Sequence, residues 1–142
     1  MEKKLDYSVL RYSPSAISGE KINLGIILCD EESNYREFYF SKKFSRLSSF
    51  DDEINLKMVK TLLYGIEEEV SGDLFSYEAF DIEKFTKFYV NDFAFDKPKT
   101  ISYTDLEDTV SRLKKTYFRF DFEKKERPSK EDWQAFYEKG WG

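Results

Sequence analysis

The N-terminal part of the chain alternates between apolar and polar residues. Residues 5–12 (LDYSVLRY), 21–29 (KINLGIILC) and 35–41 (YREFYFS) follow the two-residue period of β-strands. The segments between them are short and contain Ser, Pro, Gly and Asn, which favour turns. The pattern therefore predicts three strands joined as an antiparallel meander. In the second strand it places Ile22, Leu24, Ile26 and Leu28 on one face and Asn23, Gly25, Ile27 and Cys29 on the other.

The remainder of the chain follows the longer period of helices. Apolar residues recur at helical spacing up to Val70, and Asp51 or Asp52 can cap the helix that they predict. A second helix is expected after Asp81. A third is expected from Leu106 to Tyr117, opened by a capping box at residues 104–107 (TDLE). Residues 100–103 predict a fourth strand, and the alternation in residues 117–122 (YFRFDF) predicts a strand or extended arm.

These elements predict an α+β fold, with a small antiparallel sheet of three to four strands in the N-terminal part packed against about three helices. A chain of 142 residues has the length of one domain. We expect a single α+β domain over residues 1–122 and a charged and aromatic tail over residues 123–142. The tail carries Trp133 and Trp141, which either pack back on the domain or anchor a partner, since Trp is enriched in interface hot spots.

The composition removes much catalytic chemistry. The chain has no histidine and only one cysteine, Cys29. Serine triads, cysteine–histidine pairs and zinc sites built on histidine or several thiolates are therefore excluded. Cys29 lies in an apolar strand, where a buried structural cysteine is expected. We assign no catalytic residue, no metal ligand and no cofactor.

Charge and hydropathy indicate where the protein acts. The net charge is −5, which disfavours binding to phosphate backbones, so no nucleic-acid partner is expected. No apolar run reaches the length of a membrane span, and a lone cysteine suits a reducing compartment. We therefore expect a cytoplasmic protein without a membrane partner and with a protein partner.

Polar residues around the first loop form one candidate site. Arg11, Glu20 and Asn23 are brought near one another if the first two strands pair, and Gly25 in mid-strand indicates a bulge or a close backbone approach. One interpretation is an Arg11–Glu20 ion pair that fixes the hairpin. The other is a recognition pocket for a ligand or peptide, in which these four residues bind the partner.

Two basic groups have ordinary explanations as well as functional ones. Lys42, Lys43 and Arg46 follow the third strand, where they either meet a phosphate or form a solvated rim. A second group lies near the end of the third helix, where positive charge complements the helix dipole: Lys114, Lys115 and Arg119.

The stretch from Tyr7 to Leu28 resembles the opening of a bacterial family, domain of unknown function 3037. A strand ends in Arg-Tyr-x-Pro, a Gly-Glu loop follows, and Asn-x-Gly leads into an aliphatic strand, as in Arg11, Tyr12, Pro14, Gly19, Glu20, Asn23 and Gly25. The likeness continues through Arg46 and Leu47 and covers about Leu5 to Phe122. It implies no chemistry. Because members are often encoded beside a HipA-like kinase, it implies a partner or regulator in a toxin–antitoxin or defence-type module.

Three functional hypotheses follow. The first is a non-enzymatic protein-binding module, an adaptor or regulator that is a partner of such a kinase. The second is a phage- or mobile-element-encoded inhibitor of a bacterial defence system. The third is a small carboxylate-dependent enzyme with Glu20 as general base and Arg11 as anion anchor.

Overall fold

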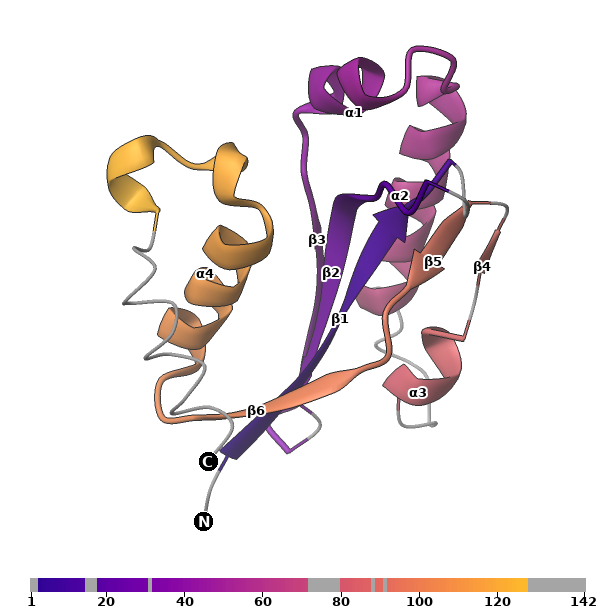
Figure 1. Ribbon diagram of the computed structural model, residues 1–142. Coiled ribbons are helices and arrows are strands. Elements are labelled where there is room, and N and C mark those ends of the chain that lie inside the picture. Colours follow the sequence, from indigo (N-terminus) through magenta and orange to yellow (C-terminus); the bar gives the residue numbers. More distant parts are fainter. Residues whose placement is uncertain are drawn as a thin grey trace.

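The structure is a computed structural model that describes residues 3–14, 18–30, 32–71, 80–87, 89–90 and 92–127. Its centre is a six-stranded sheet in which the strand pairs are antiparallel. The strands are β1 (Lys3–Tyr12), β2 (Ile22–Asp30), β3 (Tyr35–Phe40), β4 (Tyr89–Val90), β5 (Phe93–Phe95) and β6 (Lys99–Tyr103). Their order is β3-β2-β1-β5-β4, and β6 pairs with the first half of β1 (Figure 1).

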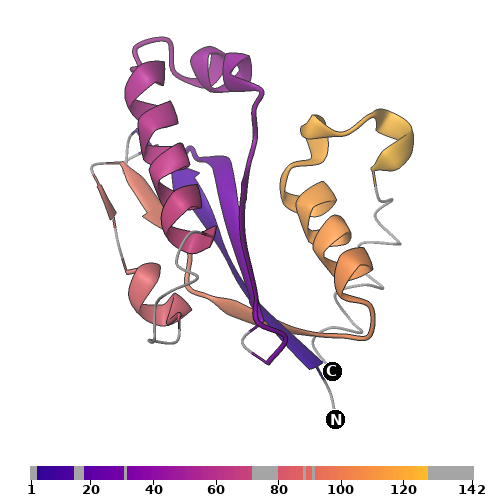
Figure 2. The same ribbon diagram turned by 180° about the vertical axis from the view of Figure 1, so that it is seen from behind.

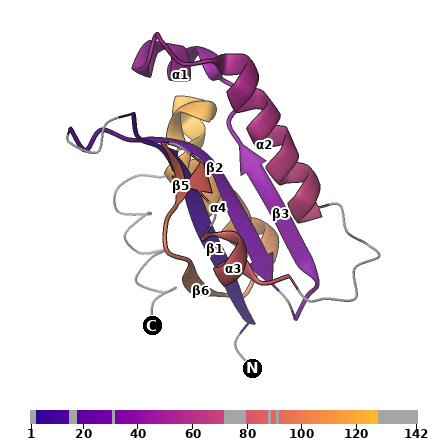
Figure 3. The ribbon, with the colours of Figure 1, turned by 90° about the vertical axis from the view of Figure 1, so that its right-hand side faces the viewer.

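Helices cover both faces of this sheet. They are α1 (Phe44–Phe50), α2 (Leu56–Ser71), α3 (Ile82–Phe85) and α4 (Leu106–Tyr117), followed by the 3-10 turns η1 (Arg119–Asp121) and η2 (Lys124–Glu126). The views from the front and from behind show α4 on one side of the strands and α2 on the other (Figures 1 and 2). Figure 3 shows α2 running along β2 and β3. No helix in the described ranges has the length and apolar character needed to cross a bilayer.

The two faces carry separate buried cores. The α2 face includes Leu10, Ile27 and Phe40 from the strands, with Val59 and Leu63 from α2. The α4 face is built around strand and helix residues of the opposite phase: Leu5, Tyr7, Val9, Ile26, Leu28, Ile101, Val110, Leu113 and Phe118. Because strand residues alternate between faces, β1 and β2 contribute to both cores and are buried along most of their length.

A β-bulge in β2 changes which residues share a face. Leu10 pairs with Gly25 and Arg11 pairs with Asn23, so Leu24 is an extra residue on β2. Leu24 therefore joins the α2 core together with Ile27, whereas Ile26 and Leu28 join the α4 core. The predicted single face for Leu24, Ile26 and Leu28 is wrong for this reason.

The predicted α+β class is confirmed, as are the first three strands, the strand before α4, and α4 itself. Helix starts differ from the prediction. Asn55, not Asp51 or Asp52, accepts from the Met58 amide (3.1 Å) at the start of α2. Asp105, not Thr104, accepts from the Asp108 amide (3.1 Å) at the start of α4. In both helices, the residue directly before the first turn accepts from one of the backbone amides that the helix start leaves without an intrahelical partner.

Four further features depart from the sequence pattern. Helix α1 and the β4–β5 pairing were not predicted. Asp81 does cap α3, accepting from the amides of Glu83 (3.0 Å) and Lys84 (3.3 Å), but that helix ends at Phe85. The expected strand or arm over residues 117–122 is instead the end of α4 and η1. There Phe118 is buried and Phe120 is half exposed, although the two side chains would share one face of a strand.

Candidate functional site: a basic cleft between α1 and the end of α4

A cleft of about 500 Å³ opens at the end of the sheet where β2 begins. Its α1 wall comes from the start of β2, the residues after β3, and α1. Its α4 wall comes from the last residues of α4 and from η1. Leu24, Leu47 and Leu63 contribute apolar lining from the α2 core, and Phe118 contributes it from the α4 side. The cleft therefore lies where the two halves of the molecule meet.

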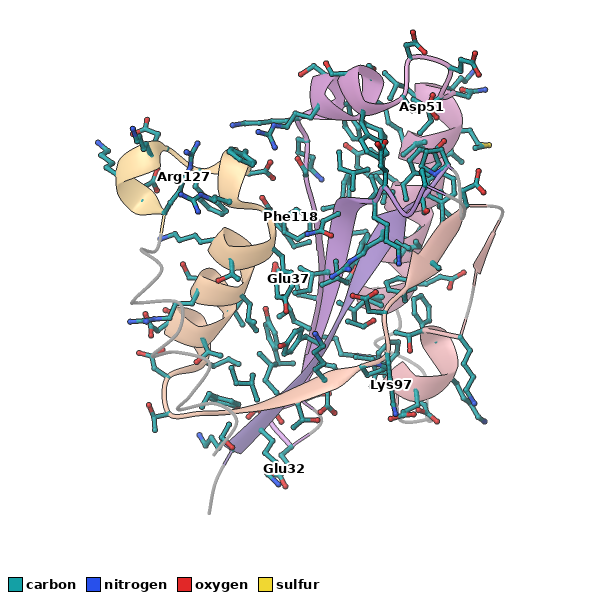
Figure 4. All side chains as sticks on the ribbon, viewed as in Figure 1. Glu32, Glu37, Asp51, Lys97, Phe118 and Arg127 are labelled. Carbon is teal, nitrogen blue, oxygen red and sulfur yellow. The ribbon has the colours of Figure 1, made fainter. Side chains whose placement is uncertain are left out.

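The α4 wall is fixed to the sheet by specific contacts. The Asn23 amide Nδ2 donates to the Tyr117 carbonyl (3.0 Å), one of the carbonyls that the end of α4 leaves without an intrahelical partner. The Phe118 ring packs edge-on against Tyr39, with centroids 5.2 Å apart. In Figure 4 the side chains of Glu37 and Phe118 lie between α4 and the strands. Sequence and packing thus hold α4 over the sheet up to the edge of the cleft.

Asp121 completes this attachment. It is the carboxylate among the cleft-lining residues, and both of its oxygens are engaged: Tyr39 donates to Oδ2 (2.8 Å) and Ser41 donates to Oδ1 (2.7 Å). Burial, then the hydrogen bond to Asp121, raises the pKa of Tyr39 above its usual value. Tyr39 therefore remains a neutral donor at physiological pH, and Asp121 ties η1 to β3.

Four exposed cations surround the opening: Lys21, Lys43 and Arg46 on the α1 wall and Arg119 on the α4 wall. We call them the rim cations. Within the described ranges, the ion pairs join Arg11 to Asp96, Arg112 to Asp108, Lys114 to Glu37 and Lys125 to Glu123. None of these pairs includes a rim cation. The cleft thus presents positive charge that the described carboxylates do not neutralise, on a chain whose net charge is −5.

Phe120 bridges the two walls. Its ring is half exposed, and the guanidinium carbons of Arg46 and Arg127 lie 4.2 Å and 5.1 Å from the ring centroid. Lys43 Nζ donates to the Phe120 carbonyl (2.8 Å). Arg127 is held in turn by the carbonyls of Arg119 (3.0 Å) and Phe122 (3.2 Å), and Figure 4 places it at the η1–η2 end of the molecule. An aromatic ring and two guanidinium groups are therefore fixed at the mouth of the cleft.

The structure does not assemble the candidate site that the first loop suggested. Arg11 pairs with Asp96 (2.8 Å), not with Glu20, and its Nε is buried without a hydrogen-bond partner among the described residues. Glu20 is exposed, and its amide donates to Ser18 Oγ (3.3 Å). Arg11 and Asn23 do face each other across β1 and β2. Of the predicted residues, Asn23 lines the basic cleft.

Gly25 has a packing role in the structure. A Cβ atom there would lie 2.5 Å from Phe38 Cζ and 3.0 Å from the Tyr39 carbonyl oxygen. The Phe38 ring is buried and stacks on Phe40, with centroids 5.8 Å apart. The close approach expected from a mid-strand glycine therefore accommodates an aromatic side chain, next to the bulge at Leu24.

The remaining sequence predictions concern the two tryptophans of the tail, Cys29 and metal ligands. Trp133 and Trp141 lie outside the described residues. Cys29 is buried, as expected for a structural cysteine. The described part of the chain contains no group of three or more carboxylate or cysteine side chains placed to hold a metal ion.

Sequence reasoning noted Lys43 with Arg46, and separately Arg119, but did not bring them together. It gave Lys21 and Phe120 no role. The signal available was the position of Phe120 directly after Arg119 in residues 117–122 (YFRFDF). That pattern shows which side chains are present, but only the return of α4 across the sheet places them opposite α1.

Comparison with known proteins gives one match. The family model described as "Protein of unknown function (DUF3037)" matches residues 7–118, which run from β1 through the end of α4. Searches of the curated proteins and of the solved structures found no match. The matched segment includes the α1 wall and the Asn23–Tyr117 contact, and it ends just before Arg119 and Phe120.

Proposed function

The chain belongs to the DUF3037 family, and we propose that it is a non-enzymatic protein-binding module that docks its partner at the basic cleft. In this proposal it acts as an adaptor or regulator in a bacterial toxin–antitoxin or defence-type module, with a HipA-like kinase as the expected kind of partner. The observation that carries the docking site is the set of rim cations, unpaired within the described ranges, around the fixed ring of Phe120.

The character of the cleft favours binding over catalysis. Its lining carboxylate, Asp121, accepts from both Tyr39 and Ser41, so its oxygens are occupied by structural contacts. The chain has no histidine, and Cys29 is buried away from solvent. A general base needs a free acceptor within reach of a substrate proton. The described lining residues offer donors instead, which suit recognition of an anionic group.

The same residues are those that protein interfaces use. Arginine and aromatic side chains are enriched in interface hot spots, where they provide contact area and directional hydrogen bonds together. Arg46 and Arg127 are already ordered by the Phe120 ring and by backbone carbonyls, so less side-chain freedom is lost when a partner binds. The cleft is therefore partly preorganised for a protein surface.

A comparative pull-down tests this proposal. The tagged full-length chain is expressed in the cells that encode it, beside an Arg46→Ala/Phe120→Ala variant and a Lys84→Ala/Lys87→Ala control in and just after α3. We expect the unaltered chain and the control to recover one partner at stoichiometric level and the cleft variant to lose it. Purified partner then gives the dissociation constant by calorimetry, and thermal unfolding checks that the variants fold.

Two outcomes contradict the proposal. Recovery of no stoichiometric protein by the unaltered chain removes the binding module itself. Equal recovery by the cleft variant and the control removes the cleft as its docking site. A matching pair, Trp133→Ala and Trp141→Ala, measures whether the tail contributes to the same complex.

A further inference from the structure

We propose that the basic cleft accepts a short acidic segment of the partner protein, one that carries at least two carboxylates and an apolar side chain. This inference rests on the proposed function and names the chemistry of the occupant. It starts from charge complementarity: the four rim cations stand on two facing walls, and the described ion pairs of the chain do not include them.

The arrangement of the cations suits an extended group of charges. Lys21 precedes β2, Lys43 and Arg46 follow β3, and Arg119 follows α4, so the four cations come from three separate segments around one cleft, and an extended group of charges can contact several of them at once. The rim cations are solvent-exposed, and an isolated exposed ion pair contributes little. Several carboxylates on one chain add their contributions, and the guanidinium groups of Arg46 and Arg119 can each bind a carboxylate in a bidentate manner.

The lining of the cleft adds a second requirement. Beside polar groups, the lining includes apolar side chains, with Leu47 and Phe118 buried and Ile22 and Phe44 partly buried. Covering this surface removes apolar area from water, which a run of carboxylates alone does not do. An apolar side chain between acidic residues matches both the rim and the lining.

A peptide fits these features better than a nucleic acid. A phosphate backbone continues beyond the cleft, where it meets the surface of a protein with a net charge of −5. Single-stranded nucleic acids also bind by stacking bases on free aromatic faces. The exposed ring at the mouth, Phe120, already carries the guanidinium groups of Arg46 and Arg127. The acidic segment needs neither a long basic track nor a free ring.

Fluorescence anisotropy with the full-length protein tests the inference. The probe is a short labelled peptide in which glutamates flank two leucines, and the matched control replaces every glutamate with glutamine. The cleft variant is Arg46→Gln/Arg119→Gln, and the control variant is Lys84→Gln/Lys87→Gln in and just after α3. We expect the acidic peptide to bind and its glutamine control not to bind. The affinity of the acidic peptide for the cleft variant should be lower by about tenfold or more, and its affinity for the unaltered chain should fall as salt is raised. The control variant should bind as the unaltered chain does.

A second variant keeps the test decisive if the double substitution fails to fold. Lys21→Gln changes an exposed rim cation whose side chain makes no ion pair with the described residues, so it should weaken peptide binding without lowering the melting temperature. Peptide affinity that the folded double variant leaves unchanged overturns the inference, and so does affinity that Lys21→Gln leaves unchanged where the double variant does not fold.

Two other ligands distinguish an acidic peptide from a nucleic acid or a small anion as the occupant of the cleft. A single-stranded oligonucleotide of matched charge that binds tighter than the peptide overturns the acidic-peptide inference in favour of a nucleic acid. If millimolar inorganic phosphate binds to the cleft and the acidic peptide does not, the cleft is a simple anion site and the inference is also overturned. If the pull-down recovers a cleft-dependent partner while the acidic peptide fails, the docking function stands and only the chemistry of its occupant is wrong.

Discussion

Both faces of the sheet have a buried aliphatic core, to which the α2 face adds mainly phenylalanine side chains, whereas the α4 face adds tyrosines that bond to carboxylates, and a lysine. On the α4 face, Glu37 accepts from Tyr35 (2.7 Å) and pairs with Lys114 (2.9 Å), Asp121 accepts from Tyr39 (2.8 Å), and Tyr103 donates to buried Asp30. At the rim of the α2 face, Tyr12 donates to Asp51 (2.5 Å).

This difference indicates what each face does. Close apolar packing is dense and tolerates little rearrangement, so the aliphatic cores of both faces provide stability. Hydrogen bonds and ion pairs contribute less to stability but fix orientation, so the α4 face determines where η1 and its arginine lie. The cleft opens at the boundary of the two, where a rigid scaffold meets an arm attached by directional contacts. Four experiments test whether the two faces differ in this way.

The largest effects are expected from truncating one buried leucine on each face. Leu63 on α2 and Leu113 on α4 are both almost fully buried, and each leucine-to-alanine change should cost about 2–5 kcal/mol. Leu63→Ala should speed hydrogen exchange throughout β1–β3, while Leu113→Ala should speed it first in α4. Urea unfolding gives the free energies of unfolding, and hydrogen-exchange mass spectrometry shows which segments exchange faster. Identical exchange patterns for the two variants would mean that the faces form one cooperative unit.

The next effect concerns the close approach on the α2 face. Gly25→Ala pushes a methyl group against Phe38 and should cost about 1–3 kcal/mol by overpacking. Adding Phe38→Leu shortens the opposing side chain and should recover part of that loss. Gly65→Ala is the control: it lies on exposed α2 with no atom near the new methyl, and helix propensity predicts a stabilisation of about 0.5–1 kcal/mol. Chemical denaturation of the three variants checks this order.

Alkaline pH should weaken both faces through their tyrosines. Burial, then the hydrogen bond to Asp51, raises the pKa of Tyr12 to about 12, and burial likewise raises the pKa values of Tyr35, Tyr39 and Tyr103. Unfolded tyrosine loses its proton near pH 10. The stabilisation is therefore complete below about pH 10 and is lost as pH rises toward the folded values.

For Tyr12 the loss between about pH 10 and 12 should be on the order of 1–2 kcal/mol. Unfolding free energies measured across this range test the sign, and Tyr12→Phe should flatten the slope by removing one titrating group. A stability that rises with pH above 10 would contradict the assignment.

The smallest effect isolates the contact that holds η1. Tyr39→Phe removes the donor to Asp121 and should cost about 0.5–1.5 kcal/mol, because Ser41 still donates to the same carboxylate. Tyr64→Phe on the exposed side of α2 is the matched control and should be nearly neutral. We expect the partner affinity to fall for Tyr39→Phe and not for Tyr64→Phe. Equal affinities would show that η1 does not depend on this contact.

Local patterns were sufficient for much of the fold. The alternation in β1 and β3 and the helical period in α4 predict these elements because each buries one or two regular faces. Helix α1 was missed because seven residues, FSRLSSF, provide less than two full turns of period. Gly25 indicated a bulge or a close approach, but the change of face at Leu24 was missed because apolar residues occupy both faces of β2, so the sequence does not show where the phase changes.

The site depended on long-range geometry. Arg11 was expected to meet Glu20, its neighbour along the loop, but the pairing of β5 and β6 with β1 brings Asp96 to it instead. In the same way, Arg119 approaches Arg46 only because α4 crosses back over the sheet. Residues far apart in sequence meet by topology, which residue patterns specify only indirectly.

The position of β1 has a consequence for synthesis. This strand leaves the ribosome ahead of every other described element and forms its first edge with β2 soon afterwards, yet its opposite edge is completed only by residues 93–103. Until translation has passed that point, a long apolar strand edge is available to other nascent chains. Premature termination in the α2–α3 region should therefore yield fragments that aggregate rather than partial domains.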